Sequence, residues 1–298
     1  MARTGKIRIG ISGWRYAPWR GDFYPEKLAQ KSELSFASGK FNSIEINGTF
    51  YSMQRVSSFE SWREDTPDDF VFSVKGPRFI THIRRLREVG TPLANFLASG
   101  VLLLGQKLGP FLWQFPANFK YQKELFEDFF KLLPGDSDSA VKVACQHDER
   151  IKTEDGLEVG AKFQVRHAIE IRNKSFVHPE FIGLLRQYNV ALVCADTVEW
   201  PRLMDLTSDF VYCRLHGSEV LYASGYDAKA LDDWARRVTD WAQGREPHDA
   251  ERVIDGAAVK SGARDVFVYF DNDIKVRAPF DAMKLTERVK KILSKAGS

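Results

Sequence analysis

The sequence predicts a single-domain (β/α)8 barrel of the TIM type, for three reasons. Eight short segments rich in β-branched and aromatic residues follow one another along the 298 residues, amphipathic helical segments lie between several of them, and polar residues come late in most of the eight. Several of these segments are apolar on both faces, which is typical of parallel strands covered by helices. A doubly wound open sheet is the competing architecture, but the turn after the first strand, GISGWRYAPW, lacks its glycine-rich phosphate pattern.

The predicted strands are short and several end at Gly, Pro, Asp or Asn. They cover residues 7–13, 42–47, 70–76, 110–116, 167–173, 190–196, 210–217 and 265–273. Helices are predicted by amphipathic periodicity and by stop signals such as Pro134-Gly135 and Gly244. These helices cover residues 123–135, 179–189, 227–244 and 281–295.

Two segments interrupt the alternation of strand and helix. Residues 136–163 contain a predicted extra helix and a polar turn, and residues 244–264 are loop-like and rich in Gly, Ala and charge. We interpret both as insertions in one domain, because the chain shows no linker, repeat or low-complexity tract.

Composition leaves the partner class open. The net charge of +3 is close to neutral for this length, so a polyanion is neither required nor excluded. Cys145, Cys194 and Cys213 lack the spacing of a metal site, and the N-terminal residues lack the apolar stretch of a signal sequence. We therefore expect a cytoplasmic protein with reduced cysteines and no membrane partner. The sequence does not indicate an oligomeric state.

Polar residues fall where a barrel places its working residues, at the carboxyl ends of the strands. In three strands two of them are two residues apart and therefore share a face. These pairs are Glu45 with Asn47, Glu170 with Arg172, and Arg214 with His216. The other strand-end polar residues are Lys75, Gln114, Asp196, Asp271, Asn272 and Asp273. A buried unpaired charge is costly, so we expect these groups to gather around one cavity, with a structural ion-pair network as the alternative.

Two loops add candidate binding groups. Trp14, Tyr16 and Trp19 follow the first strand and could stack on a sugar or a base, whereas Phe23 and Tyr24 are expected to pack the loop onto the rim. The loop after the third strand is basic, which suits a phosphate. Its candidates are Lys75, Arg78 and His82, while Arg84, Arg85 and Arg87 are expected on a solvated face.

Motifs of other chemistries are missing from the sequence, which has no G-x-S-x-G, H-E-x-x-H, Walker loop or C-x-x-C. A divalent metal on Glu45, Glu170, Asp196 and His216 is a weaker hypothesis, since neighbouring cations oppose metal binding. We therefore predict no cofactor.

Six motifs follow one another in an order and spacing that resemble the YecE-like family, also called domain of unknown function 72. They are GISGWRYAPWRGDFYP, FNSIEINGTFYS, TPDDFVFSVKGPRFITH, LGQKLGPFLWQFPANF, DFVYCRLHG and VYFDND. The resemblance covers residues 7 to 293 and implies a TIM-type barrel without an assigned reaction. It adds Tyr51 and Tyr222 to the signature residues. The chain departs from the family pattern at Gly48, Asn173 and Asp271, and a reaction that needs an imidazole at position 173 cannot run the same way here.

The leading hypothesis is a hydrolase or lyase that acts on a phosphate-bearing substrate, either a nucleic acid or a sugar phosphate. Lys75, Arg172 and Arg214 would hold the anion. Glu45 or Glu170 would be the general base and His82 or His216 the general acid, with Lys75 and Asp196 also in the catalytic set. The predicted substrate-binding residues are Trp14, Tyr16, Trp19, Asn47, Tyr51, Gln114, Arg172, Arg214, Tyr222, Asn272 and Asp273.

Two alternatives stay open. The first is a non-catalytic module that binds a nucleotide, a metabolite or a protein partner, whose polar groups should show ordinary protonation. The second is a glycosidase-like enzyme with Glu45 and Glu170 as its two carboxyl groups, which a cation wedged between them would disfavour.

Overall fold

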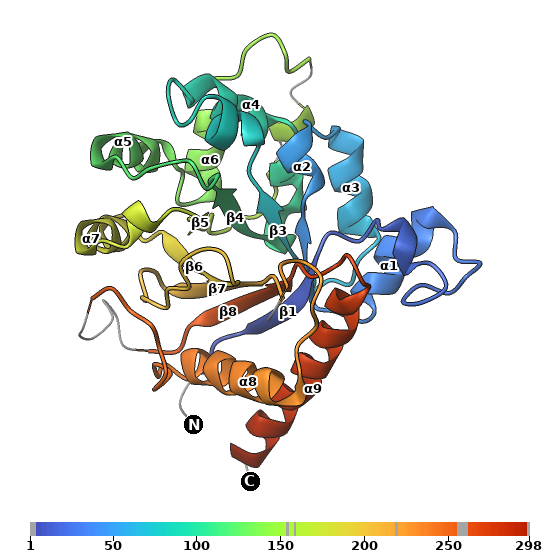
Figure 1. The fold of residues 1–298 in the computed structure, drawn as a ribbon. Helices are drawn as coiled ribbons and strands as arrows, with labels where there is room; N and C mark the ends of the chain where they lie inside the picture. Colours follow the sequence, from blue (N-terminus) through green and yellow to red (C-terminus); the bar gives the residue numbers. More distant parts are fainter. Residues whose placement is uncertain (1–3, 153–154, 158, 218–219, 255–261, 297–298) are drawn as a thin grey trace. The chain divides into compact units, whose positions relative to one another are not determined.

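All eight predicted strands are present, and they form a closed parallel barrel in the order β1 to β8 (Figure 1). The computed structural model describes residues 4–152, 155–157, 159–217, 220–254 and 262–296. The strands are β1 Ile7–Ser12, β2 Ser43–Ile46, β3 Val71–Lys75, β4 Leu108–Gln114, β5 His167–Glu170, β6 Ala191–Asp196, β7 Phe210–Leu215 and β8 Asp265–Phe270. The predicted fold class is thus confirmed.

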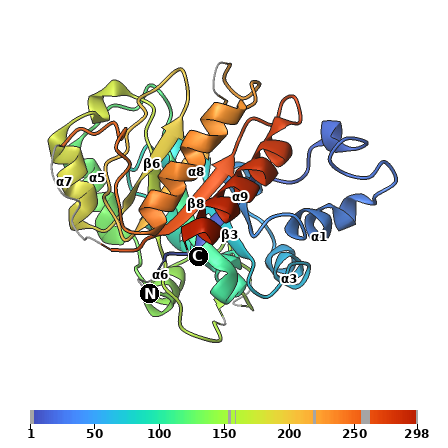
Figure 2. The same ribbon diagram turned by 90° about the horizontal axis from the view of Figure 1, so that it is seen from below.

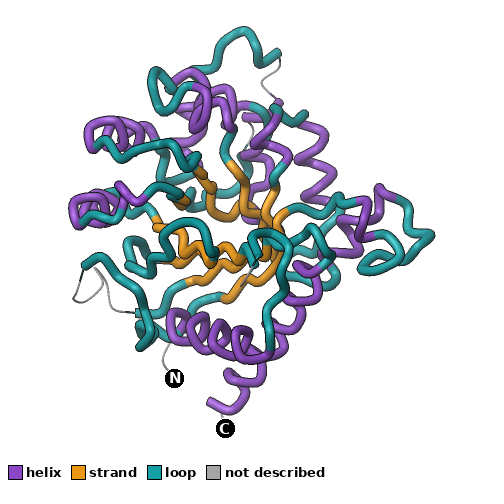
Figure 3. Tube along the Cα trace, viewed as in Figure 1, coloured by secondary structure: helices purple, strands orange, loops and turns teal. Residues whose placement is uncertain are grey.

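A helix or helical turn lies between each strand and the next along the chain except between β6 and β7; Figure 3 colours helices purple and strands orange. The α-helices are α1 Glu33–Ser38, α2 Gly48–Tyr51, α3 Val56–Glu64, α4 Gly90–Ala98, α5 Lys123–Leu132, α6 Ser137–Ala144, α7 Pro179–Gln187, α8 Ala228–Ala242 and α9 Arg277–Ala296. Short 3-10 or π turns are η1 Ala17–Trp19, η2 Gln30–Ser32, η3 Phe79–Ile83, η4 Val101–Lys107, η5 Asp155–Leu157 and η6 Lys174–Phe176.

The chain divides into two compact units, Met1–Ile44 with Val177–Ser298, and Glu45–Phe176. We call them unit 1 and unit 2. In unit 1, α8 packs against α9, and both helices contact β8 (Figure 2). Helix α8 begins where the Asp227 side chain accepts a hydrogen bond from the Ala230 N–H. Its apolar stripe, which includes the buried Trp234 and Trp241, faces the core as the periodicity predicts.

In unit 2, α4 packs against α6 and η4. Helix α6 is the extra helix predicted within residues 136–163. It starts with a capping box in which the Asp136 side chain accepts from the Ser139 N–H and the Ser139 hydroxyl lies against the Asp136 N–H. Residues 244–254 and 262–264 contain no helix or strand, as predicted for the second insertion, while residues 255–261 lie outside the described residues.

Several strands end earlier than predicted, at their carboxyl ends. β5 ends at Glu170 rather than at residue 173, and β8 ends at Phe270 rather than at 273. Beyond these points polar side chains bond to neighbouring turns and loops, and the strand ladder does not continue. Asn173, for example, donates to the Ala117 carbonyl and accepts from the Ser175 N–H. Most of the predicted site residues therefore lie on strand ends and on the turns that follow them.

The core residues of the strands follow the alternation of the pleat. On β2, Ile44 and Ile46 are fully buried on one face, and Ser43 and Glu45 share the other. The Ser43 hydroxyl lies 2.6 Å from the Tyr269 hydroxyl of β8. The predicted reduced cysteines Cys194 and Cys213 are buried on the paired strands β6 and β7.

Candidate functional site

The predicted site residues fall into two groups, one in each unit. Glu45, Asn47, Tyr51, Lys75, His82, Gln114, Glu170 and Arg172 belong to unit 2. Trp14, Tyr16, Trp19, Asp196, Arg214, His216, Tyr222, Asn272 and Asp273 belong to unit 1. The prediction that all of them surround one cavity stays a prediction.

Unit 2 contains two carboxylates that no solvent reaches. Glu45 on β2 and Glu170 on β5 both have an exposed fraction of 0%, and Lys75 and Gln114, at the ends of β3 and β4, are also buried. Strands β3, β4 and β5 pair directly and in parallel, with Gln114 in register with Glu170. Charged side chains thus come to the same edge of this part of the sheet, where their burial is costly unless they are paired or functional.

Glu170 is paired with the arginine two residues further along the chain. Both Nε and Nη2 of Arg172 lie 2.8 Å from Oε1 of Glu170. The guanidinium is largely buried, at 15% side-chain exposure. Because two donors reach one carboxylate oxygen in a buried place, the pair fixes the orientation of Arg172.

His82 lies among cations. Burial first, and then the charges of Lys75, Arg172, Arg78 and Arg85, lower the pKa of His82 from 6.5 to about 4. The imidazole is therefore uncharged at neutral pH. Its Nδ1 lies 2.8 Å from the Thr81 hydroxyl.

Phe50 of α2 connects this group of cations. The Lys75 ammonium lies 4.3 Å from the centre of the Phe50 ring, and the His82 ring contacts the same phenyl edge to face at 5.1 Å. The Thr49 hydroxyl donates to the Lys75 carbonyl at 2.6 Å, which fixes α2 on the end of β3. We call Lys75, Arg78, Arg85 and Arg172, whose charges act on His82, the cationic cluster.

Two sequence predictions concern this cluster. With its pKa lowered to about 4, the His82 side chain is present as the neutral imidazole at neutral pH in the unliganded protein, so its role as general acid stays a prediction for the liganded protein. Arg84 and Arg85, which were expected on a solvated face, are both half-buried. The guanidinium of Arg85 lies 4.6 Å from the Phe119 ring centre and donates to Asn118, and Arg84 forms an ion pair with Glu88.

Unit 1 contains a second group of ionisable residues, around Asp271. Nη2 of Arg214 lies 2.8 Å from Oδ2 of Asp271, and Nδ1 of His216 lies 3.1 Å from the same oxygen. Both Arg214 and His216 are fully buried. Arg214 also reaches the Ser12 hydroxyl at 3.4 Å. From the sequence, Asp271 was placed at the end of its strand without a role. Its role as partner of Arg214 and His216 becomes visible only when the strands are paired, because those two residues come from the end of another strand.

Asp273, two residues beyond Asp271, is a carboxyl group whose protonation its surroundings alter. Burial first, and then the charge of Asp271, raise the pKa of Asp273 from 3.8 to about 6, although Tyr16 and Arg214 act in the opposite direction. A carboxyl group with a pKa near neutrality can both accept and donate a proton under physiological conditions. Asp273 was predicted only to bind substrate, and its environment suits it to proton transfer as well.

Four predicted residues of unit 1 have structural surroundings that differ from the predicted roles. Trp19 is fully buried, with its ring against Tyr16, Phe23 and Tyr24, so it offers no stacking platform. Trp14 is buried too, and its carbonyl accepts from the Tyr24 hydroxyl.

Asp196 and Asn272 are the other two. Oδ1 of Asp196 accepts from Arg202 and Oδ2 accepts from Trp234 of α8, so this carboxylate ties β6 to the helix layer rather than facing a substrate. The Asn272 amide donates to Ser224 and to Asp281 of α9.

Tyr222 has a φ of 60°, which is uncommon for a residue with a Cβ, and its ring contacts His216 edge to face. Phe23 and Tyr24 are buried, as predicted.

A metal centre has no support among the described residues, where no three His, Cys, Asp or Glu side chains lie close enough together to hold an ion. The same described residues include no helix long and apolar enough to cross a membrane.

Comparison with known proteins identifies the family of this chain. Residues 8–296 match the family described as "Protein of unknown function DUF72". The chain belongs to this family. It is 25% identical to the UPF0759 protein YunF of Bacillus subtilis over 300 residues, which covers 90% of this chain and 89% of that protein. It is 32% identical to the UPF0759 protein YecE of Escherichia coli K12 over 139 residues, or 46% of this chain and 48% of that protein.

Solved structures of DUF72 proteins have the same fold. A DUF72 family protein of Thermotoga maritima superposes with a TM-score of 0.69 at 23% identity, covering 97% of this chain and 99% of the other. A DUF72 family protein of Enterococcus faecalis superposes with a TM-score of 0.65 at 18% identity, covering 97% and 98%. The family carries no assigned activity, so the function has to be argued from the residues.

Proposed function

We propose that this DUF72 protein is a hydrolase or lyase that acts on a phosphate-bearing substrate. The observation that supports the proposal most strongly is the cationic cluster of unit 2, where the charges of Lys75, Arg172, Arg78 and Arg85 help to keep His82 uncharged. Several cations gathered near the carboxyl ends of β3 and β5 favour an anion. Phosphate matches this arrangement, because arginine binds it through paired donors and lysine binds it as a point charge.

The buried carboxylates would supply the base. Glu170 is engaged in orienting Arg172, so Glu45 is our candidate for the general base and Arg172 for a ligand of the phosphoryl oxygens. In hydrolysis, a water oxygen bonds to phosphorus while Glu45 takes a proton from the water, and the P–O bond to the leaving group breaks. The leaving oxygen then takes a proton from a group that carries one near neutral pH.

An anion in the cluster would also change His82. A bound phosphate offsets the cationic charges that lower the pKa of His82, so the imidazole becomes easier to protonate once substrate is present. A general-acid role for His82 is thereby compatible with the liganded protein.

The alternatives make different predictions. In the glycosidase hypothesis Glu170 would be an acid or nucleophile, but two donors of Arg172 lie 2.8 Å from its Oε1, which disfavours that role. A purely binding module should show ordinary protonation, whereas the pKa of His82 is lowered and that of Asp273 is raised.

The test is turnover of two synthetic substrates, p-nitrophenyl phosphate and bis(p-nitrophenyl) phosphate, by the purified protein. We expect Glu45→Gln and Arg172→Ala each to lower kcat/KM by about 100-fold or more, the usual effect of removing a general base or a charge-stabilising donor. Arg166→Ala is the matched control, because Arg166 precedes β5 at the opposite end of the strand from Arg172. Turnover that survives both substitutions, or that Arg166→Ala reduces equally, contradicts the proposal.

A further inference from the structure

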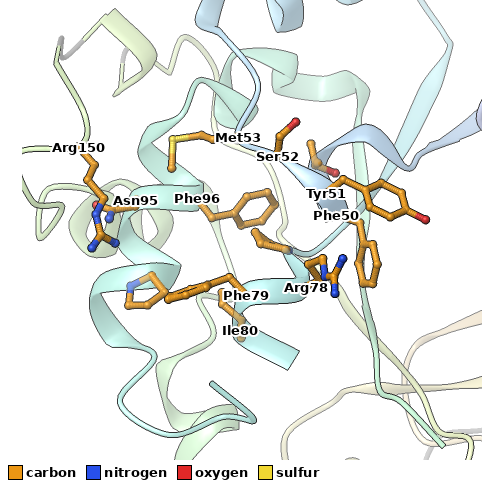
Figure 4. A pocket seen from close by; sticks show the side chains of 13 residues that line it. Phe50, Tyr51, Ser52, Met53, Arg78, Phe79, Ile80, Asn95, Phe96 and Arg150 are labelled. Atoms are coloured by element: carbon orange, nitrogen blue, oxygen red, sulfur yellow. The ribbon is translucent and has the colours of Figure 1, made fainter. Parts of the chain in front are cut away.

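An apolar pocket in unit 2 lies beside the cationic cluster. It is formed by α2 and the turn after it, by the start of η3, and by α4, and its volume is about 190 Å³ (Figure 4). Its walls include the rings of Phe50, Tyr51, Phe79 and Phe96. Tyr51 and Phe79 are 71% and 42% exposed, respectively, although both side chains are large and aromatic. Exposed aromatic side chains around a hollow are typical of a ligand site.

The charges of this pocket are of one sign. Arg78 and Arg150 line it, and no aspartate or glutamate does among the described residues. Arg150 lies 3.9 Å from Asp148, a loose contact, and Asp148 is itself held by two hydrogen bonds with Asn95. The pocket therefore combines an apolar interior with a cationic rim, which is complementary to an anion that has an apolar body.

The size of the pocket limits that body. An apolar cavity of about 150 Å³ accommodates benzene, whereas sites for drug-sized ligands measure about 300–1,000 Å³. A pocket of about 190 Å³ therefore holds one substituted aromatic ring. The surrounding phenyl and phenol rings favour a flat group that can stack or pack edge to face.

Two residues of the pocket connect it to the cationic cluster. Phe50 forms a wall of the pocket while its ring also contacts Lys75 and His82. Arg78 lines the pocket and is one of the cations that act on His82. A ligand whose ring occupies the pocket thus has its anionic end beside the cluster.

We propose that the pocket binds the aromatic ring of a phosphate ester, with the phosphate at Arg78 and Lys75. Aryl phosphates, and nucleotides with a single ring system, belong to this substrate class. The inference rests on the proposed function, because it takes the cluster to be the phosphate site, and it deepens that function by naming the group next to the phosphate. Phe50 becomes the boundary between the two parts of the ligand.

The experiment is calorimetric titration of the full chain with three probes: phenyl phosphate, inorganic phosphate and phenol. We expect phenyl phosphate to bind at least tenfold more tightly than inorganic phosphate. Tyr51→Ala should weaken phenyl phosphate alone, and Arg78→Ala should weaken both phosphates. Arg87→Ala is the matched control, since Arg87 is exposed on the same basic loop and does not line the pocket.

The outcomes separate the two proposals. Tight, Tyr51-dependent binding of phenyl phosphate without any hydrolysis supports the pocket and contradicts the proposed reaction. Equal affinities for phenyl phosphate and inorganic phosphate, both lost in Arg172→Ala, overturn the pocket and leave the phosphate site. Binding of phenol as tight as that of phenyl phosphate also overturns the inference, because the cationic rim would then contribute nothing.

Discussion

The protonation of His82 should report whether an anion occupies the cationic cluster. Burial and four cations lower its pKa from 6.5 to about 4. At pH 5.5 a pKa of about 4 leaves about 3% of the imidazole protonated, and a rise of the pKa by one increases this to about 24%. A phosphate placed among Lys75, Arg172, Arg78 and Arg85 offsets the cationic contribution while the burial remains. The pKa of His82 should therefore rise on phosphate binding but stay below 6.5.

Thermodynamic linkage gives the same prediction from the side of the ligand. If phosphate raises the pKa of His82 by one, then phosphate binds about tenfold, or about 1.4 kcal/mol, more tightly to the protonated protein. The affinity for an anion of constant charge should thus increase as the pH falls towards the pKa of His82, but phosphate itself takes up a proton near neutral pH. A substrate analogue that does not change its charge in this range, such as sulfate, removes that complication.

Nuclear magnetic resonance of 15N-labelled histidine rings measures this pKa with and without sulfate. His248, which is exposed and belongs to unit 1, provides a reference signal in the same spectrum. Arg172→Ala should raise the pKa of His82 in the absence of anion, because one cation is removed, and Arg166→Ala should not. A His82 pKa near 6.5 in anion-free buffer would show that the cations do not lower it. A pKa that sulfate binding leaves unchanged would show that the anion does not bind beside His82.

Three further predictions concern single residues. His167 is buried, and its pKa is lowered from 6.5 to about 4. The unfolded chain therefore takes up the proton first as the pH falls, and the free energy of unfolding should decrease by about 3 kcal/mol between pH 6.5 and 4. Denaturant unfolding of the wild type and of His167→Gln checks this, and equal pH slopes for the two proteins would contradict it. Trp19→Ala should cost about 3–5 kcal/mol of stability, because Trp19 is fully buried, whereas Tyr51→Ala should cost less than about 1 kcal/mol, because Tyr51 is 71% exposed. Comparable losses for the two variants in thermal unfolding would contradict this difference in burial. Asp273 should titrate near pH 6, and Asp271→Asn should lower that pKa by removing a neighbouring negative charge; a carboxyl 13C titration that stays unchanged in the variant would exclude the coupling.

The strands could be predicted from the sequence because their signal is local. Apolar runs such as the one ending at Asp196 are bounded by turn residues, and the alternation on β2 separates Ile44 and Ile46 from Glu45 without any tertiary information. The ends of β5 and β8 could not be placed in the same way. β5 ends at Glu170, and beyond it the Asn173 side chain bonds to the Ala117 carbonyl, which lies 56 residues away in the chain.

Helix α4 shows a different limit. Its residues Leu93 to Ala98 are all buried, so the segment lacks the polar face that makes a helix recognisable from periodicity. The amphipathic stripe of α8, in contrast, was predicted from Leu231, Trp234, Val238 and Trp241 alone.

The candidate site was predictable in its residue types and not in its pairings. Residues such as Glu45, Lys75 and Arg172 stand out because charges on apolar strands need an explanation. Whether a charge is paired depends on residues far along the chain, however, as with the contact between Arg214 and Asp271 across 57 positions. The sequence therefore assigned catalysis to Asp196, whose two oxygens in fact bond Arg202 and Trp234.

Whether the cationic cluster binds phosphate is decided most directly by a crystal structure of the protein soaked in phosphate. We expect an anion within hydrogen-bond distance of Lys75 and Arg172, with density for the ion lost in Arg172→Ala and kept in Arg166→Ala. Well-ordered side chains without anion density under saturating phosphate, or a divalent cation bound to Glu45 and Glu170 instead of the anion, would contradict phosphate binding at this site.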